Sequence, residues 1–396
     1  MNGSVVSHAL VEADNLQFLK SVTVSDVYDL VGQVDTLYLD PPYNTRSKDL
    51  TYQDTLSTDV WCQMMRDVLL PAKRLLKPTG VVVVSIADDS QHLLRGVMDD
   101  VFGARNFIAQ LVVDGGANKN NSAFFSVTHE YMVVYGMNVA VLRKSGLKWR
   151  KERDHVREVL AEWERIKAEG LPHDKVTVHM KRWLRNQPGF SKRLKVFFNS
   201  EPRGLFTYAD LSVPGNRYEY DVYHPVTGKK VVEPSRGWGL DETKFKRLVA
   251  DDMIIWGADE TFQPLKKLFL SDQKDQLMGS VLAYPARTPT HQLEKLIGRR
   301  SGFSNPKNLE MMKDVLDYVT PLDGVVLDYF AGSGTTLHAV LDLNAEQVNS
   351  TRRCVAVTNN EANIFRDVAV PRVEAVLSQD GYADQQVNVV YSDSSQ

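Results

Sequence analysis

The sequence predicts a doubly wound α/β domain built on a mostly parallel sheet. Short apolar runs alternate with segments of helical periodicity in the first third of the chain, and again towards its end. Residues 81–86 form an almost continuous apolar run, which is typical of a strand covered on both faces. The 396 residues are 43% apolar and 24% charged, as expected for a folded globular chain with a large core.

In the first third, predicted strands and helices follow one another closely. Residues 34–39 are a strand that ends at the rigid turn Asp40-Pro41-Pro42-Tyr43, because proline cannot continue a hydrogen-bonded ladder. Thr58 is the expected N-cap of a helix to about Leu76, and Pro78-Thr79-Gly80 breaks it before the strand 81–86. Three further elements are expected: a helix at 88–102, closed by Gly103, and strands at 107–113 and 131–135.

The middle of the chain breaks this alternation and marks an inserted region. Residues 148–169 predict a highly charged helix, ended by Gly170-Leu171-Pro172. Turn signals such as Pro214-Gly215-Asn216 predict short strands and irregular loops over 206–270.

The alternation returns near the end of the chain. A helix is expected at 308–319, a strand at 324–329, a tight loop at 330–334 and a helix at 335–343. A strand at 353–357 and a helix at 362–377 follow, and the polar residues 381–396 predict a loosely held tail.

Composition excludes several classes of protein. No run of 18 apolar residues exists, and residues 1–10 lack the pattern of a secretory signal, so neither a membrane span nor secretion is expected. Two cysteines, Cys62 and Cys354, cannot build a disulfide framework or a four-cysteine metal site. A reducing cytoplasm is the simplest compartment.

The formal net charge of −3 hides an asymmetry. Residues 141–205 hold 17 Lys and Arg against 8 Asp and Glu, whereas the rest of the chain holds 30 against 42. Such a basic block indicates either a polyanionic partner or a solvated helical face, and the charge count leaves both open.

A glycine-rich segment, Asp328 to Thr336, follows a predicted strand. Glycines there let the backbone approach a ligand closely, and the next helix offers unpaired N–H groups at its start. A P-loop would need Gly-Lys-Ser/Thr, and a dinucleotide fingerprint would need Gly or Ala where Leu337 stands. The residues therefore favour a nucleoside ligand without phosphate over pyrophosphate, with a purely structural turn as the alternative.

The Asp40-Pro41-Pro42-Tyr43 turn also ends a strand, where ligands bind in open α/β sheets. Asp-Pro-Pro is a good structural turn in its own right. It also combines a carboxylate acceptor, a fixed carbonyl acceptor and an aromatic plate, and this set suits the exocyclic amino group of a planar base.

Taken together, the two segments resemble those of amino-group DNA methyltransferases that use S-adenosylmethionine. The catalytic motif precedes the cofactor motif, which is the permuted order called the β class. The resemblance to this family extends to four further segments: Asp14-Asn15-Leu16, Ser122 to Tyr135, Phe303-Ser304-Asn305-Pro306-Lys307 and Thr358-Asn359-Asn360-Glu361. Two more segments resemble the modification (Mod) subunits of type III restriction systems: His224-Pro225-x-Thr227-Gly228-Lys229 and Arg236-Gly237-Trp238.

The resemblance implies a Rossmann-like methyltransferase sheet, circularly permuted, with an inserted α+β target-recognition region. Residues 1–140 would be the catalytic half, 141–285 the target-recognition region, 286–380 the S-adenosylmethionine-binding half and 381–396 a flexible tail.

The resemblance also implies roles for particular residues. The catalytic set is Asp40, Pro41, Pro42 and Tyr43, in which Asp40 and the Pro41 carbonyl accept hydrogen bonds from the target amine while Tyr43 stacks on the base. The cofactor set is Asp14, Asn305, Pro306, Lys307, Asp328, Phe330, Ala331, Gly332, Ser333, Gly334, Thr335 and Glu361. The substrate set is Phe124 or Phe125 as a second stacking wall, with Lys181, Arg182 and Arg185 on the DNA backbone.

The implied activity is transfer of a methyl group to N6 of a flipped adenine in double-stranded DNA, without a metal. N4 of cytosine is the nearest alternative; a recognition subunit of a restriction complex, and RNA or protein methylation, also remain open. Cytosine C5 chemistry is not expected, because neither cysteine follows a proline. Expected partners are a second copy of the chain and a restriction nuclease, in the cytoplasm of a prokaryote or a phage-infected host cell.

Overall fold

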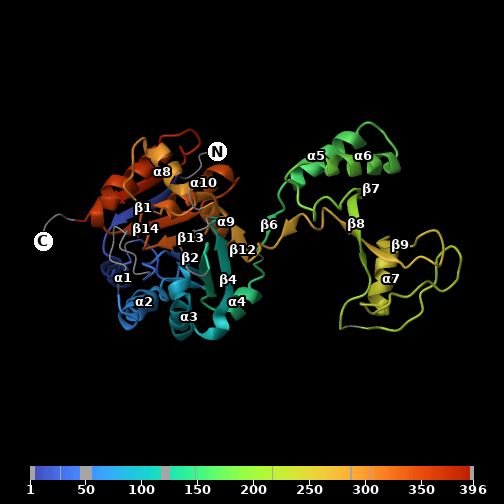
Figure 1. Cartoon of the computed structure of the whole chain (residues 1–396), viewed down its shortest axis with the longest axis horizontal. Helices are drawn as coiled ribbons and strands as arrows, with labels where there is room; N and C mark the ends of the chain where they lie inside the picture. The colour runs from blue at the N-terminus through green and yellow to red at the C-terminus, as the bar shows by residue number, and fades with distance from the viewer. Residues whose placement is uncertain are drawn as a thin grey trace. The chain divides into compact units, whose positions relative to one another are not determined.

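The computed structural model describes residues 5–26, 28–44, 56–116, 125–147, 149–215, 217–285, 288–303 and 305–392. It divides into two compact units (Figure 1). The large unit comprises Met1–Trp149 and Met278–Gln396, and the inserted unit is Arg150–Leu277. The insertion is thus narrower than the predicted 141–285, because residues on both flanks pack with the large unit.

The large unit is built on a nine-stranded sheet in the order β12-β4-β5-β3-β2-β13-β14-β1-β15. β5 runs antiparallel to its two neighbours, and the other pairings are parallel, which confirms the predicted mostly parallel sheet. The strands are β1 (Val6–Glu12), β2 (Val34–Leu39), β3 (Leu76–Ile86), β4 (Phe107–Asp114), β5 (His129–Gly136), β12 (Val281–Ala283), β13 (Val325–Asp328), β14 (Arg353–Thr358) and β15 (Gln385–Val390).

Helices cover both faces of this sheet (Figure 1). One face carries α1 (Asn15–Val24), α2 (Thr58–Ala72) and α3 (Asp88–Phe102), and the other carries α8 (Thr288–Ile297), α9 (Leu309–Val319), α10 (Thr335–Glu346) and α11 (Val370–Leu377). A short helix, α4 (Val139–Lys144), follows β5. The apolar run in β3 serves both layers, since Val82 and Val84 belong to the first core and Val81 and Val83 to the second.

Two boundaries in the first half differ from prediction. Ser57, rather than Thr58, caps α2 through its hydroxyl, and the helix ends at Ala72 instead of near Leu76. β3 already begins at Leu76 and runs through Pro78-Thr79-Gly80, which was predicted to be a break. A register shift between β2 and β3 accommodates the proline, because Val34 pairs with Leu76 while Thr36 pairs with Val81.

The C-terminal segment was predicted wrongly at two places. The expected helix 362–377 begins as a 3₁₀ turn (Glu361–Asn363) and a π turn (Phe365–Ala369), because Ala362 is left-handed at φ 50°; only Val370–Leu377 is α-helical. Residues expected to form a loose tail include β15, which extends the sheet by pairing with β1 from Val6↔Gln385 to Val11↔Val390.

The inserted unit has its own cores. α5 (Val156–Lys167) and α6 (His173–Arg185) pack on one, while Trp238 and α7 (Glu242–Ala250) belong to another. Its strands are β6 (Lys151–Glu152), β7 (Asn199–Glu201), β8 (Gly204–Asp210), β9 (Ile254–Ile255), β10 (Leu265–Phe269) and β11 (Asp275–Gln276). The charged helix starts later than the predicted residue 148, because Lys151–Glu152 pairs with Asp275–Gln276 and His155 is left-handed at φ 62°. Across the described residues, no helix is long and apolar enough to span a membrane.

Candidate active site

A cavity of about 1270 Å³ opens at the carboxyl ends of the central strands of the large unit. β2 and β13 are neighbours there, with Leu37 paired to Leu327, so the turn after β2 and the loop after β13 face the same space. The volume exceeds the roughly 300–1000 Å³ of a typical small-ligand pocket. It therefore offers room for two ligands side by side.

The Asp-Pro-Pro-Tyr turn is held from behind by helix α2. The indole N–H of the fully buried Trp61 donates to the Pro42 carbonyl over 2.8 Å. At the front, the Tyr43 hydroxyl lies 2.8 Å from Asp40 Oδ1. These two hydrogen bonds fix the direction in which the Asp40 carboxylate points at the end of β2.

A second carboxylate and an ammonium group complete this cluster. Lys307 Nζ lies 3.0 Å from Asp40 Oδ1 and 3.5 Å from Glu130 Oε2. The same Glu130 oxygen is 3.0 Å from the Tyr43 hydroxyl, which has one proton and therefore donates to one carboxylate at a time. Lys307 precedes α9 in the second half of the chain, whereas its three partners come from the first half.

Burial and charge act in opposite directions on this cluster. Burial raises the pKa of Asp40; the nearby Lys307 ammonium opposes that rise, and Glu130 adds to it. For Lys307, burial alone would lower the pKa, but Asp40 and Glu130 outweigh it and hold the pKa well above its usual range. The lysine is therefore a permanent cation beside Asp40.

The glycine-rich loop is fixed by Asp328, the last residue of β13. The buried Asp328 carboxylate accepts hydrogen bonds from the Phe330 N–H at 2.9 Å and the Thr336 hydroxyl at 2.5 Å. Burial raises the pKa of Asp328 to about 7, although both hydrogen bonds oppose that shift. Gly332 and Gly334 adopt left-handed backbone conformations, with φ of 49° and 77°, that L side chains rarely adopt.

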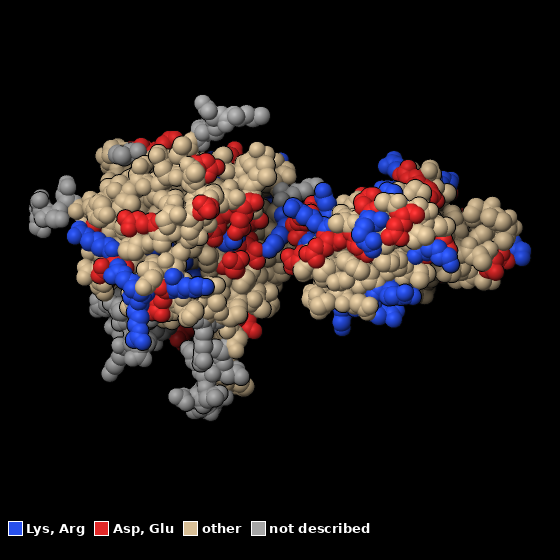
Figure 2. All heavy atoms as spheres, turned by 90° about the horizontal axis from the view of Figure 1, so that it is seen from above, with Lys and Arg blue, Asp and Glu red and all other residues tan. Residues whose placement is uncertain are grey.

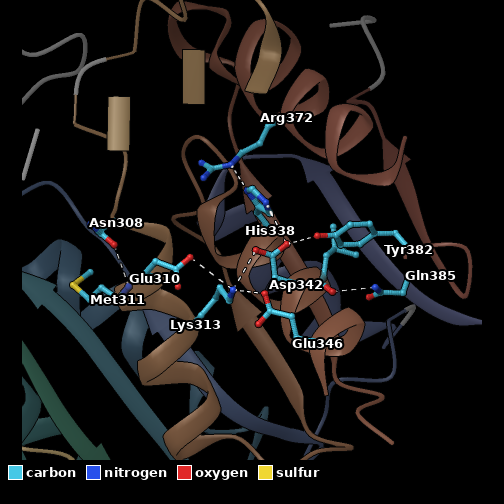
Figure 3. Close-up of polar contacts among 11 residues, drawn as sticks. Asn308, Glu310, Met311, Lys313, His338, Asp342, Glu346, Arg372, Tyr382 and Gln385 are labelled. Atoms are coloured by element: carbon cyan, nitrogen blue, oxygen red, sulfur yellow. Dashed lines mark hydrogen bonds and ion pairs between the residues drawn. The ribbon is translucent and has the colours of Figure 1, made fainter. Parts of the chain in front are cut away.

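A buried arginine holds the same loop from the side of α11. Arg372 donates to the Ser333 carbonyl at 3.3 Å, to the Thr335 hydroxyl at 2.7 Å and to His338 Nδ1 at 3.2 Å. Figure 3 shows Arg372 above His338, with the carboxylate of Asp342 beyond it. The loop shape thus depends on a polar network that lies behind the cavity.

The described lining of the cavity is strongly acidic. Lys307 is the one Lys or Arg in that lining, against eight carboxylates: Asp14, Asp40, Asp88, Asp89, Glu130, Asp328, Glu361 and Asp367. This excess favours a ligand that carries positive charge. A nucleoside cofactor with a sulfonium fits these residues. The loop leaves space for such a ligand, because Gly332 has no side chain. A Cβ at Gly332 would point into the cavity, 3.7 Å from Phe303 Cζ.

Most of the predicted cofactor residues line this cavity. Among them Lys307 differs from the rest, because its ammonium contacts the Asp-Pro-Pro-Tyr turn. The cavity-lining members of the cofactor set are Asp14, Asn305, Pro306, Lys307, Asp328, Phe330, Ala331, Gly332, Ser333, Thr335 and Glu361. Gly334 is not among the lining residues, since it faces Ala369 instead.

Of the catalytic set, Asp40, Pro42 and Tyr43 line the cavity, and Pro41 is buried beside them. Of the two predicted stacking residues, Phe124 lies outside the described residues. Phe125 is 88% exposed and is not part of the described lining. Glu130 was not selected from the sequence, although its position at the start of a strand inside a family-like segment was a usable signal.

Glu361 is expected either to reach a ribose or only to open the next helix. It lines the cavity beyond β14 and is exposed. Glu12, at the end of the neighbouring β1, is buried and paired with Arg366 at 3.2 Å, and it is not part of the described lining.

The basic block of the sequence separates into two parts in the inserted unit. Figure 2 shows Lys and Arg interspersed with Asp and Glu on its visible face. On α5, Arg165 is paired with Glu162 at 2.8 Å and Lys167 with Glu164, both on the same helix, and Arg157 is paired with Glu152 of β6. Six cations between residues 173 and 195 are exposed and make no ion pair with a described acid: Lys175, Lys181, Arg182, Arg185, Lys192 and Arg193.

The fold and the two facing loops define a Rossmann-like α/β protein whose ligand site lies at the carboxyl ends of adjacent strands. The chain belongs to the DNA methylase family, whose model of N6 and N4 methylases matches residues 34–355.

Relatives of the chain come from restriction-modification systems. It is 27% identical over 376 residues to the Mod subunit of the type III restriction-modification enzyme EcoP15I from Escherichia coli, covering 87% of this chain and 57% of that protein. It is 25% identical over 387 residues to the type II methyltransferase M.KpnI from Klebsiella pneumoniae, covering 89% of this chain and 81% of the relative. The chain thus spans just over half the length of the type III relative.

Among solved structures, the cytosine-N4-specific PvuII DNA methyltransferase aligns over 97% of this chain and 92% of its own, at 9% identity and a TM-score of 0.45. Neither the fold nor the function assigned to this chain rests on that likeness.

Proposed function

We propose that the chain is a site-specific DNA methyltransferase that transfers a methyl group from S-adenosylmethionine to N6 of a flipped adenine. One observation carries the proposal: the Asp40 carboxylate after β2 and the glycine-rich loop after β13 face one acidic cavity from adjacent strands. Membership of the DNA methylase family supports the reaction class.

In this proposal the cofactor lies along the loop after β13. Asp328 shapes the loop, the Gly332 backbone approaches the ligand, and Phe330 and Phe303 give apolar contact. Asp14 and Glu361 also line the cavity and would bind the nucleoside part of the cofactor. The cofactor supplies a methyl group on a positively charged sulfur, and the surrounding carboxylates of the cavity suit that charge.

The target base would enter from the side of the Asp-Pro-Pro-Tyr turn. Asp40 accepts one amine hydrogen, and the Pro41 carbonyl accepts the other, because the Pro42 carbonyl is already used by Trp61. Both acceptors make the amine nitrogen more tetrahedral and more nucleophilic. Holding that nitrogen in line with the methyl group then provides most of the rate enhancement.

Double-stranded DNA is the proposed substrate, and the unpaired cations of α6 are its proposed contacts. Lys181, Arg182 and Arg185 are exposed on one helix, so their ammonium and guanidinium groups are available to phosphates. Since an amino group inside a duplex cannot reach a cavity of this kind, the base must be flipped. A second stacking wall from Phe124 or Phe125 remains a proposal.

The names of the relatives support a role in restriction and modification. M.KpnI is a type II methyltransferase of which the chain covers most, which favours activity of this chain without a partner. Assembly with a restriction nuclease, or into a homodimer, is proposed on the similarity to type III Mod subunits. A cytoplasmic location, in a prokaryote or a phage-infected cell, is part of the same proposal.

N4 of cytosine is the second candidate, because its amine presents nearly the same geometry to Asp40. The test is sequencing, with detection of modified bases, of DNA from cells that express this chain alone, followed by nucleoside analysis. N6-methyladenine at one short motif is the expected result. N4-methylcytosine would replace the base assignment, and unmodified DNA that is also not methylated by the purified chain would refute the function.

A further inference from the structure

Lys307 occupies the position that the proposed mechanism reserves for the target. Its ammonium lies 3.0 Å from Asp40 Oδ1, the acceptor for the amine, and 4.9 Å from the centre of the Tyr43 ring, the plate for the base. Both contacts come from one side chain that is only 14% exposed. A base cannot take either contact while the ammonium keeps both.

We propose that Lys307 is the resident counter-ion of Asp40, which holds the place of the target amine in the ligand-free site and keeps the Asp40 carboxylate ionised. This inference rests on the proposed function and adds a positioning residue to it. It also replaces the role in cofactor binding predicted for Lys307 from the sequence.

The surroundings of Asp40 explain why a counter-ion is needed. Four other titratable groups face it: Tyr38 from β2, Tyr43 from the turn, Glu130 from β5 and Asp328 from β13. None of these groups is a cation, and two of them are carboxyl groups. Without Lys307, burial and the Glu130 carboxylate would favour the protonated acid, opposed only by the hydrogen bond from Tyr43. A protonated Asp40 is a poorer acceptor for the amine hydrogen.

Glu130 gives the displaced ammonium a place to go. Its Oε2 atom lies 3.5 Å from Lys307 Nζ. A small shift of the flexible lysine stem towards Glu130 frees Asp40 Oδ1 for the amine while the positive charge stays near the carboxylate. The exchange replaces one N–H donor on Asp40 by another, so the acceptor is never left without a partner.

The test compares Lys307→Met with two control variants. Lys307→Arg keeps the charge. Lys313→Met removes a lysine of similar exposure, 12%, that is bound to Glu310, Asp342 and Glu346 and lies outside the described lining of the cavity (Figure 3). The measurements are kcat/KM on a methylatable duplex as a function of pH, and S-adenosylmethionine affinity by calorimetry.

Lys307→Met should move the acidic limb of the pH profile upward by about one to three units, with activity recovering at alkaline pH. Lys307→Arg and Lys313→Met should keep the wild-type limb. If the acidic limb of the pH profile stays in place in Lys307→Met, the proposal is overturned. If it stays in place and S-adenosylmethionine binding is weakened, Lys307 is a cofactor-binding residue instead.

A second measurement keeps this test separate from the proposed function. Infrared difference spectroscopy against Asp40→Asn follows the ionisation of the Asp40 carboxyl without turnover. A higher midpoint in Lys307→Met than in wild type supports the counter-ion role even if no methyl transfer is found. Equal midpoints refute it even in an active enzyme.

Discussion

Trp61→Phe tests whether helix α2 holds the catalytic turn. The substitution keeps a buried aromatic ring but removes the N–H that donates to Pro42. Pro42 is half-buried, and a buried carbonyl without a partner costs about 1–3 kcal/mol, so this range is an upper bound for the lost bond. The smaller ring leaves a cavity that adds about 1–2 kcal/mol. We therefore expect urea denaturation to show a loss of about 2–5 kcal/mol in the large unit.

The effect on activity should exceed the effect on cofactor binding. Pro42 follows Asp40 by two residues, so loss of the hydrogen bond to Pro42 should let the Asp40 carboxylate adopt other orientations. We expect kcat to fall by about tenfold or more as a result. Trp163→Phe in the inserted unit is the matched control, since it removes an indole bond of 2.9 Å to Ser200. It should cost stability without lowering kcat per folded molecule. Unchanged stability and kcat in Trp61→Phe would show that the Trp61 hydrogen bond does not hold the turn.

Three further predictions concern the cofactor loop and the DNA surface. Gly332→Ala should weaken S-adenosylmethionine binding about 5–30-fold in calorimetry, because an L-residue in a left-handed conformation costs about 1–2 kcal/mol. The control is Gly146→Ala, which has a φ of 76° with no atom within 4 Å of an added Cβ and should leave the affinity unchanged. Burial raises the pKa of Asp328 to about 7, so between about pH 4 and 7 the folded chain holds a proton that the unfolded chain has lost. The free energy of unfolding of wild type should therefore fall as the pH rises through this window, and Asp328→Asn should gain stability relative to wild type over the same range. A stability difference that does not change with pH would contradict the raised pKa. Replacing Lys181, Arg182 and Arg185 by Gln should lower DNA affinity and reduce its salt slope by about 0.9 per lost phosphate contact, whereas Arg165→Gln with Lys167→Gln should change neither.

The fold could be predicted where a single local pattern decides the structure. The run 81–86 is apolar at every position but Ser85, and the sheet uses both of its faces. Turn residues also worked, since Gly103 ends α3 as expected. The errors fall where distant residues decide the structure. Three of the six residues of β15 are polar, and the segment forms a strand by pairing with the edge of β1.

Most residues that line the cavity could be predicted from the sequence, but the contacts between them could not. Asp40 and the loop at Asp328 were found from their motifs, because each ends a strand. The pairing of Lys307 with Asp40 joins residues 267 positions apart, and no local pattern reports it. Glu130 lay in a family-like segment, but its contacts with Lys307 and Tyr43 depend on which residues the fold brings near it.

Methyl transfer by Asp40→Ala tests the proposed role of Asp40 most directly. Purified wild type and variant are compared with tritiated S-adenosylmethionine and duplex DNA, with the modified nucleoside identified and cofactor affinity measured in parallel. Wild type should form N6-methyladenine, and the variant should bind the cofactor without transferring the methyl group. Methyl transfer by Asp40→Ala at the wild-type rate would rule out Asp40 as the acceptor for the target amine.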